Sequence, residues 1–164
     1  MGKRIVALTL LYLSLSGNTL AAGDKKHHHL NHHIVGVFNG ITDTEDTSET
    51  GYGLEYEYRY NHRWGLGVVW EKTQDGYDDH HGHRENLSVT LASAYYHINA
   101  WRLGLGAGQE RVHGDHPHTE SLIRASVAYD IHLTEKFGVA PIVNLDRVDN
   151  HNVYVYGMTF NIGF

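Results

Sequence analysis

The sequence contains no cysteine, only two prolines, and no apolar run of membrane-helix length after its first 22 residues. The absence of cysteine excludes disulfide bonds and thiolate chemistry. Basic residues are also scarce, with 13 Lys and Arg against 19 Asp and Glu, and the resulting net charge of −6 argues against a nucleic-acid partner, which needs a basic face. Glycine, tyrosine and histidine are abundant instead, and their positions along the chain indicate both a fold and candidate binding residues.

The first 22 residues have the pattern of a secretory signal peptide. Lys3 and Arg4 give a basic start, residues 5–15 form an apolar run, and Ala21 and Ala22 are small enough for a cleavage site. The run is shorter than the roughly 20 residues that a spanning helix needs. We therefore expect residues 1–22 to be removed, leaving a histidine-rich tail at 23–33 and one barrel domain at 34–164.

The rest of the chain alternates with a period of two residues, which is typical of β-strands. In the clearest segment, Tyr52, Leu54 and Tyr56 alternate with Gly53 and Glu55. One face of each strand is large and apolar, and the other is small or charged. The first segment alternates poorly, so its faces stay unassigned. Strands are expected at 34–41, 51–60, 64–73, 85–97, 101–112, 119–132, 137–147 and 152–164.

Strand length and connection length both favour a membrane barrel over a soluble β-sandwich. A tilted strand crosses a bilayer in about 9–11 residues, close to the lengths expected here. Tight turns at 61–63, 98–100 and 133–136 alternate with longer connections at 42–50, 74–84 and 113–118, while the connection at 148–151 is short. Aromatic side chains gather toward the two ends, as in the girdles of membrane barrels. Those at the tight-turn end are Tyr60, Trp64, Tyr95, Trp101, Phe137 and Phe164, and those toward the other end are Tyr52, Trp70 and Tyr154. The predicted fold is an all-β, eight-stranded antiparallel transmembrane up-and-down β-barrel.

In this pattern the chain resembles the small eight-stranded outer-membrane proteins of the OmpA and OmpX type. The resemblance covers the chain after the signal peptide and rests on architecture and on the alternating ending of residues 160–164, which closes on Phe164. It implies a Gram-negative outer membrane, both termini in the periplasm, and longer connections outside the cell. It also implies contact with outer-membrane lipid and lipopolysaccharide, and recognition of Phe164 by the barrel-assembly machinery.

Alternation directs a set of charged side chains into the lumen of such a barrel. An eight-stranded barrel is just wide enough to be filled by side chains, and buried charges must be paired. We therefore expect a plug of Arg–carboxylate pairs rather than a pore, with Arg124 near mid-depth among Glu55 and Glu57. The expected charge network comprises Glu55, Glu57, Arg59, Glu71, Arg102, Glu110, Arg124 and Asp130, together with Glu120, Asn144 and Asp146.

The histidines form the sharper functional pattern. They cluster in the tail and in two connections, where they are interleaved with carboxylates. Imidazole is a common ligand of zinc, copper and nickel, whereas calcium prefers oxygen. The expected metal ligands are His80, His81, His83, His113, His116 and His118 outside, and His27, His28, His29, His32 and His33 in the tail. The sequence thus favours transition-metal binding, for zinc or copper capture or tolerance, with zinc or another transition metal as the only expected cofactor. Histidine-rich composition without a ligand role, metal buffering by the tail, and pH sensing stay open.

Two other functions remain as alternatives. The main one is a structural or adhesive barrel without a metal role, whose connections contact a host surface or lipid sugar. The segment 42–49 is acidic and hydroxyl-rich, as expected of a hydrated loop or of one that meets lipopolysaccharide through divalent cations. A minor alternative is a lipid A-modifying enzyme, but the nearest approach to a His–Ser pair, His118 and Ser121, lacks the expected spacing and a third group. We therefore predict no catalytic residue and no enzymatic activity.

Overall fold

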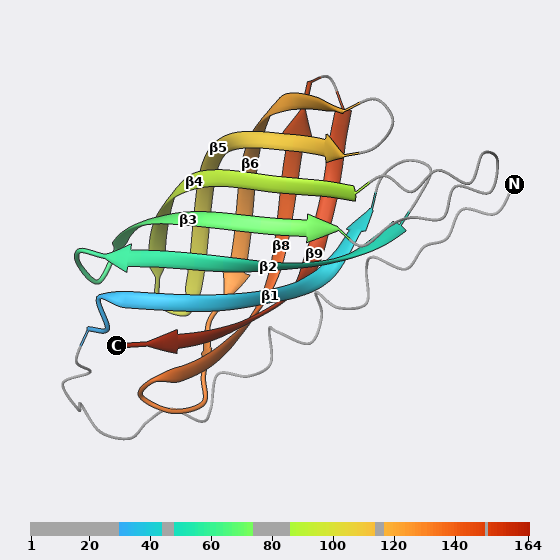
Figure 1. Ribbon diagram of the computed structural model, residues 1–164. Helices are drawn as coiled ribbons and strands as arrows, with labels where there is room; N and C mark the ends of the chain where they lie inside the picture. Colours follow the sequence, from blue (N-terminus) through green and yellow to red (C-terminus); the bar gives the residue numbers. More distant parts are fainter. Residues whose placement is uncertain (1–29, 44–47, 74–85, 114–116, 150) are drawn as a thin grey trace, which may run out of the picture.

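The computed structural model describes residues 30–43, 48–73, 86–113, 117–149 and 151–164, in which nine β-strands form one antiparallel sheet (Figure 1). The strands are β1 (His33–Asp43), β2 (Ser48–Arg59), β3 (Trp64–Thr73), β4 (Asn86–Ile98), β5 (Trp101–His113), β6 (His118–Tyr129), β7 (Ile131–His132), β8 (Phe137–Val148) and β9 (His151–Gly163). The expected signal peptide, residues 1–22, lies outside the described residues.

No helix among the described residues is long and apolar enough to cross a membrane.

The sheet closes on itself because β1 pairs with both β2 and β9. The closing seam runs from Ile34 opposite Gly163 to Asp43 opposite Tyr154, and its end is fixed by two backbone hydrogen bonds of 3.0 and 2.9 Å between His33 and Phe164. Each described strand except the two-residue β7 therefore has two partners, as expected of a sheet that crosses a bilayer without an open edge. The predicted closed antiparallel barrel is confirmed.

The barrel has eight strands because β6 and β7 are two parts of one barrel strand. Both pair with β8 in a single register, which places Pro141 opposite Tyr129, next to the break at Asp130. Proline has no N–H and cannot complete the ladder there. The backbone N–H of Asp130 instead donates to the carbonyl of Ala100 at 2.7 Å. The single strand expected at 119–132 is thus interrupted at one point.

The tight-turn end of the barrel is formed by three short connections, at 60–63, 99–100 and 133–136. In the first, the Asn61 side chain accepts hydrogen bonds from the backbone N–H groups of Arg63 and Trp64 at 2.8 and 2.9 Å. In the second, Asn99 has a φ of 55°, a left-handed conformation that asparagine tolerates well. Figure 1 shows the C-terminus at this same end, beside the start of β1. We call the opposite end, where β1, β3, β5 and β8 finish, the long-connection end.

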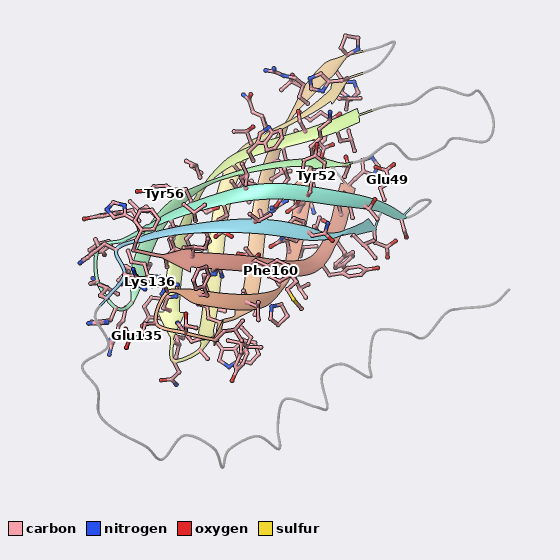
Figure 2. The ribbon with its side chains drawn as sticks, turned by 60° about the horizontal axis from the view of Figure 1, so that its bottom comes forward. Glu49, Tyr52, Tyr56, Glu135, Lys136 and Phe160 are labelled. Carbon is pink, nitrogen blue, oxygen red and sulfur yellow. The ribbon has the colours of Figure 1, made fainter. Side chains whose placement is uncertain are left out.

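The outer surface is apolar and the buried charged side chains face the lumen, the reverse of a soluble protein. Large apolar side chains such as Leu54, Leu105 and Phe160 point outward and are more than half exposed. Figure 2 shows Phe160 midway along the barrel wall, with Tyr56, Glu135 and Lys136 toward one end and Glu49 and Tyr52 toward the other. A continuous exposed band of this kind matches the hydrocarbon layer of a bilayer. In β1, whose faces the sequence left open, Val35, Val37 and Ile41 lie on this outer face.

One aromatic residue was assigned to the wrong face. Tyr95 was expected in the girdle at the tight-turn end, but it is 4% exposed and points into the lumen. Its neighbour Tyr96 points outward and packs on Trp64, with ring centroids 4.7 Å apart. Gly67 and Gly104 on the adjacent strands make room for the Tyr95 ring, since a Cβ on either would approach it to 2.9 or 3.0 Å. Two consecutive tyrosines are equally large and aromatic, so the sequence does not show which of them faces outward.

Candidate functional site

The first cluster of lumen charges lies toward the tight-turn end and has Glu57 at its centre. Glu57 has a relative exposure of 0% and accepts hydrogen bonds from His97 at 2.7 Å and from Arg59 at 3.1 Å. Arg102, on β5 across the barrel, is hydrogen-bonded to Glu55 and has its Nη1 3.6 Å from a Glu57 oxygen. These contacts join β2, β4 and β5 through the lumen.

Asp130 extends this cluster to the sixth barrel strand. It lies just after β6, and its carboxylate is 3.4 Å from Arg59 Nη2 and 3.9 Å from Arg102 Nε. His97 Nδ1 is 3.8 Å from the same carboxylate. His97 was not expected among the lumen charges. The signal that identifies it is its phase, because it shares the inward face of β4 with Leu91, Ser93 and Tyr95.

The second cluster lies toward the long-connection end and is organised by Arg124. Its guanidinium donates to both oxygens of Glu71, at 2.6 and 2.7 Å, and to both oxygens of Asp146, at 2.6 Å each. Glu71 is on β3, so this contact crosses the barrel from β6. The expectation that Arg124 lies among Glu55 and Glu57 is therefore wrong. Those two carboxylates are held by Arg102 and Arg59 instead, because the strand register sets Arg124 level with Asp146.

Apolar side chains fill much of the remaining lumen. One group, Phe38, Ala128, Ala140, Ile142 and Val155, packs together, and a second group comprises Val69, Val89, Leu91, Leu122 and Val148. Asn144, 1% exposed, also faces inward. Together with the ion pairs, these side chains block the central part of the barrel.

Two cavities lie on either side of this blocked region. The larger, of about 440 Å³, opens at the tight-turn end and is bordered by Arg59, His97 and Asp130. The smaller, of about 20 Å³, lies beside Arg124 and Glu71. The residues that line the two cavities do not overlap.

The remaining expected lumen residues lie near the long-connection end. Glu110 and Glu120 face inward and stand directly opposite each other on β5 and β6. His118 Nε2 is 3.4 Å from Glu120 Oε1. This pair brings one of the predicted metal ligands beside a carboxylate, but among the described residues no group of three or more His, Asp or Glu side chains could hold a metal ion.

The other predicted metal ligands fall into two groups. Seven of them, namely His27, His28, His29, His80, His81, His83 and His116, lie outside the described residues. His32, His33 and His113 are described. His113 is the exposed last residue of β5, whereas His32 and His33 are engaged in contacts at the start of β1. His32 Nδ1 donates to the carbonyl of Arg59 at 2.7 Å, and the ring of His33 stacks on Phe164 with centroids 5.7 Å apart.

The side chains considered for catalysis point in opposite directions. Ser121 lies on the outer, exposed face of β6, whereas His118 shares the inward phase of Glu120. Neighbours on a strand alternate between faces, so an offset of three residues separates the two groups by the barrel wall. Ser121 and His118 do not form a nucleophile–base pair in this geometry.

Comparison with solved structures places the architecture among membrane barrels. The chain is similar to neisserial surface protein A, with a TM-score of 0.62 and 13% identity over 80% of this chain and 96% of that one. It is also similar to the Pseudomonas aeruginosa outer-membrane protein OprG, with a TM-score of 0.52 and 13% identity over 84% and 99% of the two chains. A de novo designed transmembrane β-barrel matches with a TM-score of 0.54 and 10% identity, over 82% and 98%.

No protein-family model matches the sequence, and no curated protein matches it. The fold is nevertheless that of the small eight-stranded outer-membrane β-barrels, as the sequence predicted.

Proposed function

We propose that the chain is a closed, non-conducting outer-membrane barrel that serves as a rigid platform, presenting its long-connection end at the cell surface for structural or adhesive contacts. The observation that carries this proposal is the filled lumen inside an apolar outer surface. The apolar outer band favours insertion into the hydrocarbon layer of a bilayer, and the ion-paired interior leaves no path for ions.

The lumen charges support a structural role because the central ones are paired with one another. Arg124 is bound by two carboxylates, and Glu57 is bound by His97 and Arg59. A permeation path needs charged groups that can exchange partners with passing ions and water. The contacts here join strands on opposite walls, so they brace the barrel.

Planar-bilayer recording of the folded full chain tests this proposal. We expect no steady conductance, and we expect the band on an electrophoresis gel to shift when the sample is boiled, because an unboiled barrel stays folded in detergent. Steady channel currents of uniform size would contradict the filled-lumen proposal. The absence of a heat-dependent shift would contradict the membrane barrel itself.

A second candidate function is transition-metal binding at the long-connection end, and the pairing of β4 with β5 favours it. Asn86, the first residue of β4, stands opposite His113, the last residue of β5. The segment 74–85 therefore ends beside the start of the segment 114–117, and each carries predicted ligands. Two histidine-bearing segments anchored at neighbouring points can contribute to one ion.

Calorimetric titration of the folded chain with zinc, copper and nickel tests the metal proposal. We expect micromolar or tighter binding at pH 7.5 that is lost at pH 5.5, because protonated imidazole does not bind metal. Replacing His80, His81, His83, His113, His116 and His118 by asparagine should abolish the binding. The matched control replaces His27, His28, His29, His32 and His33 instead, and loss in this control alone would move the metal role to the tail. No binding at either pH would contradict the metal proposal, and the platform function would then be the only one left.

A further inference from the structure

The ion-pair cluster at the tight-turn end carries an excess of negative charge. It contains three carboxylates and two guanidinium groups, those of Glu55, Glu57, Asp130, Arg59 and Arg102. While the imidazole of His97 is neutral, one carboxylate in the cluster has no counter-charge. A buried charge destabilises a protein unless a partner neutralises it. The cluster therefore has a place for one further cation.

Asp130 is the carboxylate with the weakest contacts in this cluster. Its distance to Arg59 Nη2 is 3.4 Å, and its distance to Arg102 Nε is 3.9 Å. Glu57, by contrast, accepts hydrogen bonds of 2.7 and 3.1 Å. The Oδ1 atom of Asp130 is buried and has no hydrogen-bond partner among the described residues. The excess negative charge therefore lies mainly on Asp130.

Asp130 borders the cavity of about 440 Å³ at the tight-turn end, whose volume is within the range of small-molecule sites. Gly138 and Gly163 of the inward face also line this cavity, and they have no side chain that could fill it. Asn31 forms another part of the wall. Its side chain donates to the backbone carbonyl of Glu135 at 2.8 Å, which holds the chain before β1 against the opposite turn.

The rest of the lining adds apolar contacts and a further acceptor but no net charge. Glu135 and Lys136, which Figure 2 shows together at this end, carry opposite charges. Leu30 and Ile34 contribute apolar side chains. Asn161 Oδ1 is a second buried oxygen without a hydrogen-bond partner in the described part of the chain. The cavity thus suits a ligand with one positive charge, N–H donors and a short aliphatic chain.

We propose that this cavity binds a primary aliphatic ammonium group, with its N–H donors on Asp130 and its alkyl chain against Leu30 and Ile34. An ammonium group brings the positive charge and the donors together, in a charge-assisted hydrogen bond. A metal ion does not fit equally well, because no group of three or more His, Asp or Glu side chains in the described ranges could hold one. This binding site goes beyond the platform function and does not depend on it.

Two sources of the ammonium group are a free amine and the chain's own Lys25 or Lys26. These lysines precede Leu30, where the described part of the chain begins in the cavity wall. His97 would also balance the cluster if it were protonated. The test is therefore made at pH 8, where an ordinary imidazole is neutral and an aliphatic ammonium group stays charged.

Nuclear magnetic resonance of the isotope-labelled full chain, folded in detergent and titrated with butylammonium, tests this inference. Butyltrimethylammonium is a matched probe that keeps the charge without N–H donors, and butanol keeps the chain without the charge. We expect saturable shifts at the backbone amides of Ile131, His132 and Gly138, which line the cavity. Both matched probes should bind about tenfold more weakly, since a hydrogen bond to a charged group is worth at least that factor.

The variant Asp130→Asn removes the charge and keeps the size of the side chain. We expect it to bind butylammonium about tenfold more weakly and to leave butanol binding unchanged. The matched control is Asp149→Asn, because Asp149 is exposed in the turn after β8 at the other end of the barrel. This control should bind like the unmodified chain. If Asp130→Asn does not fold, the three probes still test the inference on the unmodified chain.

The outcomes separate this inference from the proposed function. Equal affinity for the three probes, or equal losses in Asp130→Asn and Asp149→Asn, would overturn the ammonium site and leave the platform function intact. Tighter butylammonium binding in Lys25→Gln/Lys26→Gln would support the tail as the native source of the ammonium group, and unchanged binding would support a free amine. Steady channel currents would contradict the platform function without bearing on the cavity.

Discussion

Replacing Arg124 by methionine is expected to lower the free energy of unfolding by about 3–5 kcal/mol, which is typical of breaking a buried ion pair from one side. The guanidinium is 4% exposed and satisfies both oxygens of Glu71 and of Asp146. Without it, two carboxylates stay close together in the lumen with no counter-charge. Urea unfolding of the barrel in lipid vesicles, followed by tryptophan fluorescence, measures the loss.

The control for Arg124 is Arg63→Met, because Arg63 is exposed in the β2–β3 turn. We expect it to change stability by less than about 0.5 kcal/mol. The triple variant Arg124→Met/Glu71→Met/Asp146→Leu should recover most of the lost stability, since apolar groups can replace a buried ion cluster at little cost. A single Arg124→Met variant as stable as its control would contradict the cross-lumen contacts.

Introducing arginine at position 105 should cost about 2–4 kcal/mol in a bilayer, the penalty measured for a charge on the lipid face at mid-depth. Leu105 is 64% exposed, and it lies near the centre of β5 with its side chain on the outer face. In a soluble protein an exposed leucine can be exchanged for arginine almost freely, so the size of the effect reports on the lipid. Unfolding in vesicles gives the value.

Gln109→Arg is the matched control on the same strand and the same face. It lies level with Trp70, at the boundary of the apolar band, where the expected cost falls to about 0–1 kcal/mol. In a bilayer, Leu105→Arg should lower the stability more than Gln109→Arg. In a soluble protein, the two variants would have similar effects, because both side chains would face water. Equal effects at positions 105 and 109 would contradict the placement of the bilayer along β5.

The candidate site was only partly predictable from sequence. Alternation assigned the inward phase of Glu57 and Arg102 because each strand residue has one of two directions. It did not assign partners, since Arg124 and Glu71 are more than 50 residues apart and meet only through the register of the strands between them. His97 was missed because the adjacent Tyr95 and Tyr96 did not show which face of their segment points into the lumen. The histidines outside the described residues stay a prediction.

The sequence by itself determined the number of barrel strands, the closure of the sheet into a barrel, and the faces of the large side chains outside β1, with Tyr95 as an exception. These properties depend on the two-residue period and on turn chemistry, which are local. Only the tertiary structure decided which charges neutralise one another and where the lumen is blocked. These depend on the stagger between neighbouring strands, which accumulates around the barrel and brings together residues that have no fixed spacing along the chain.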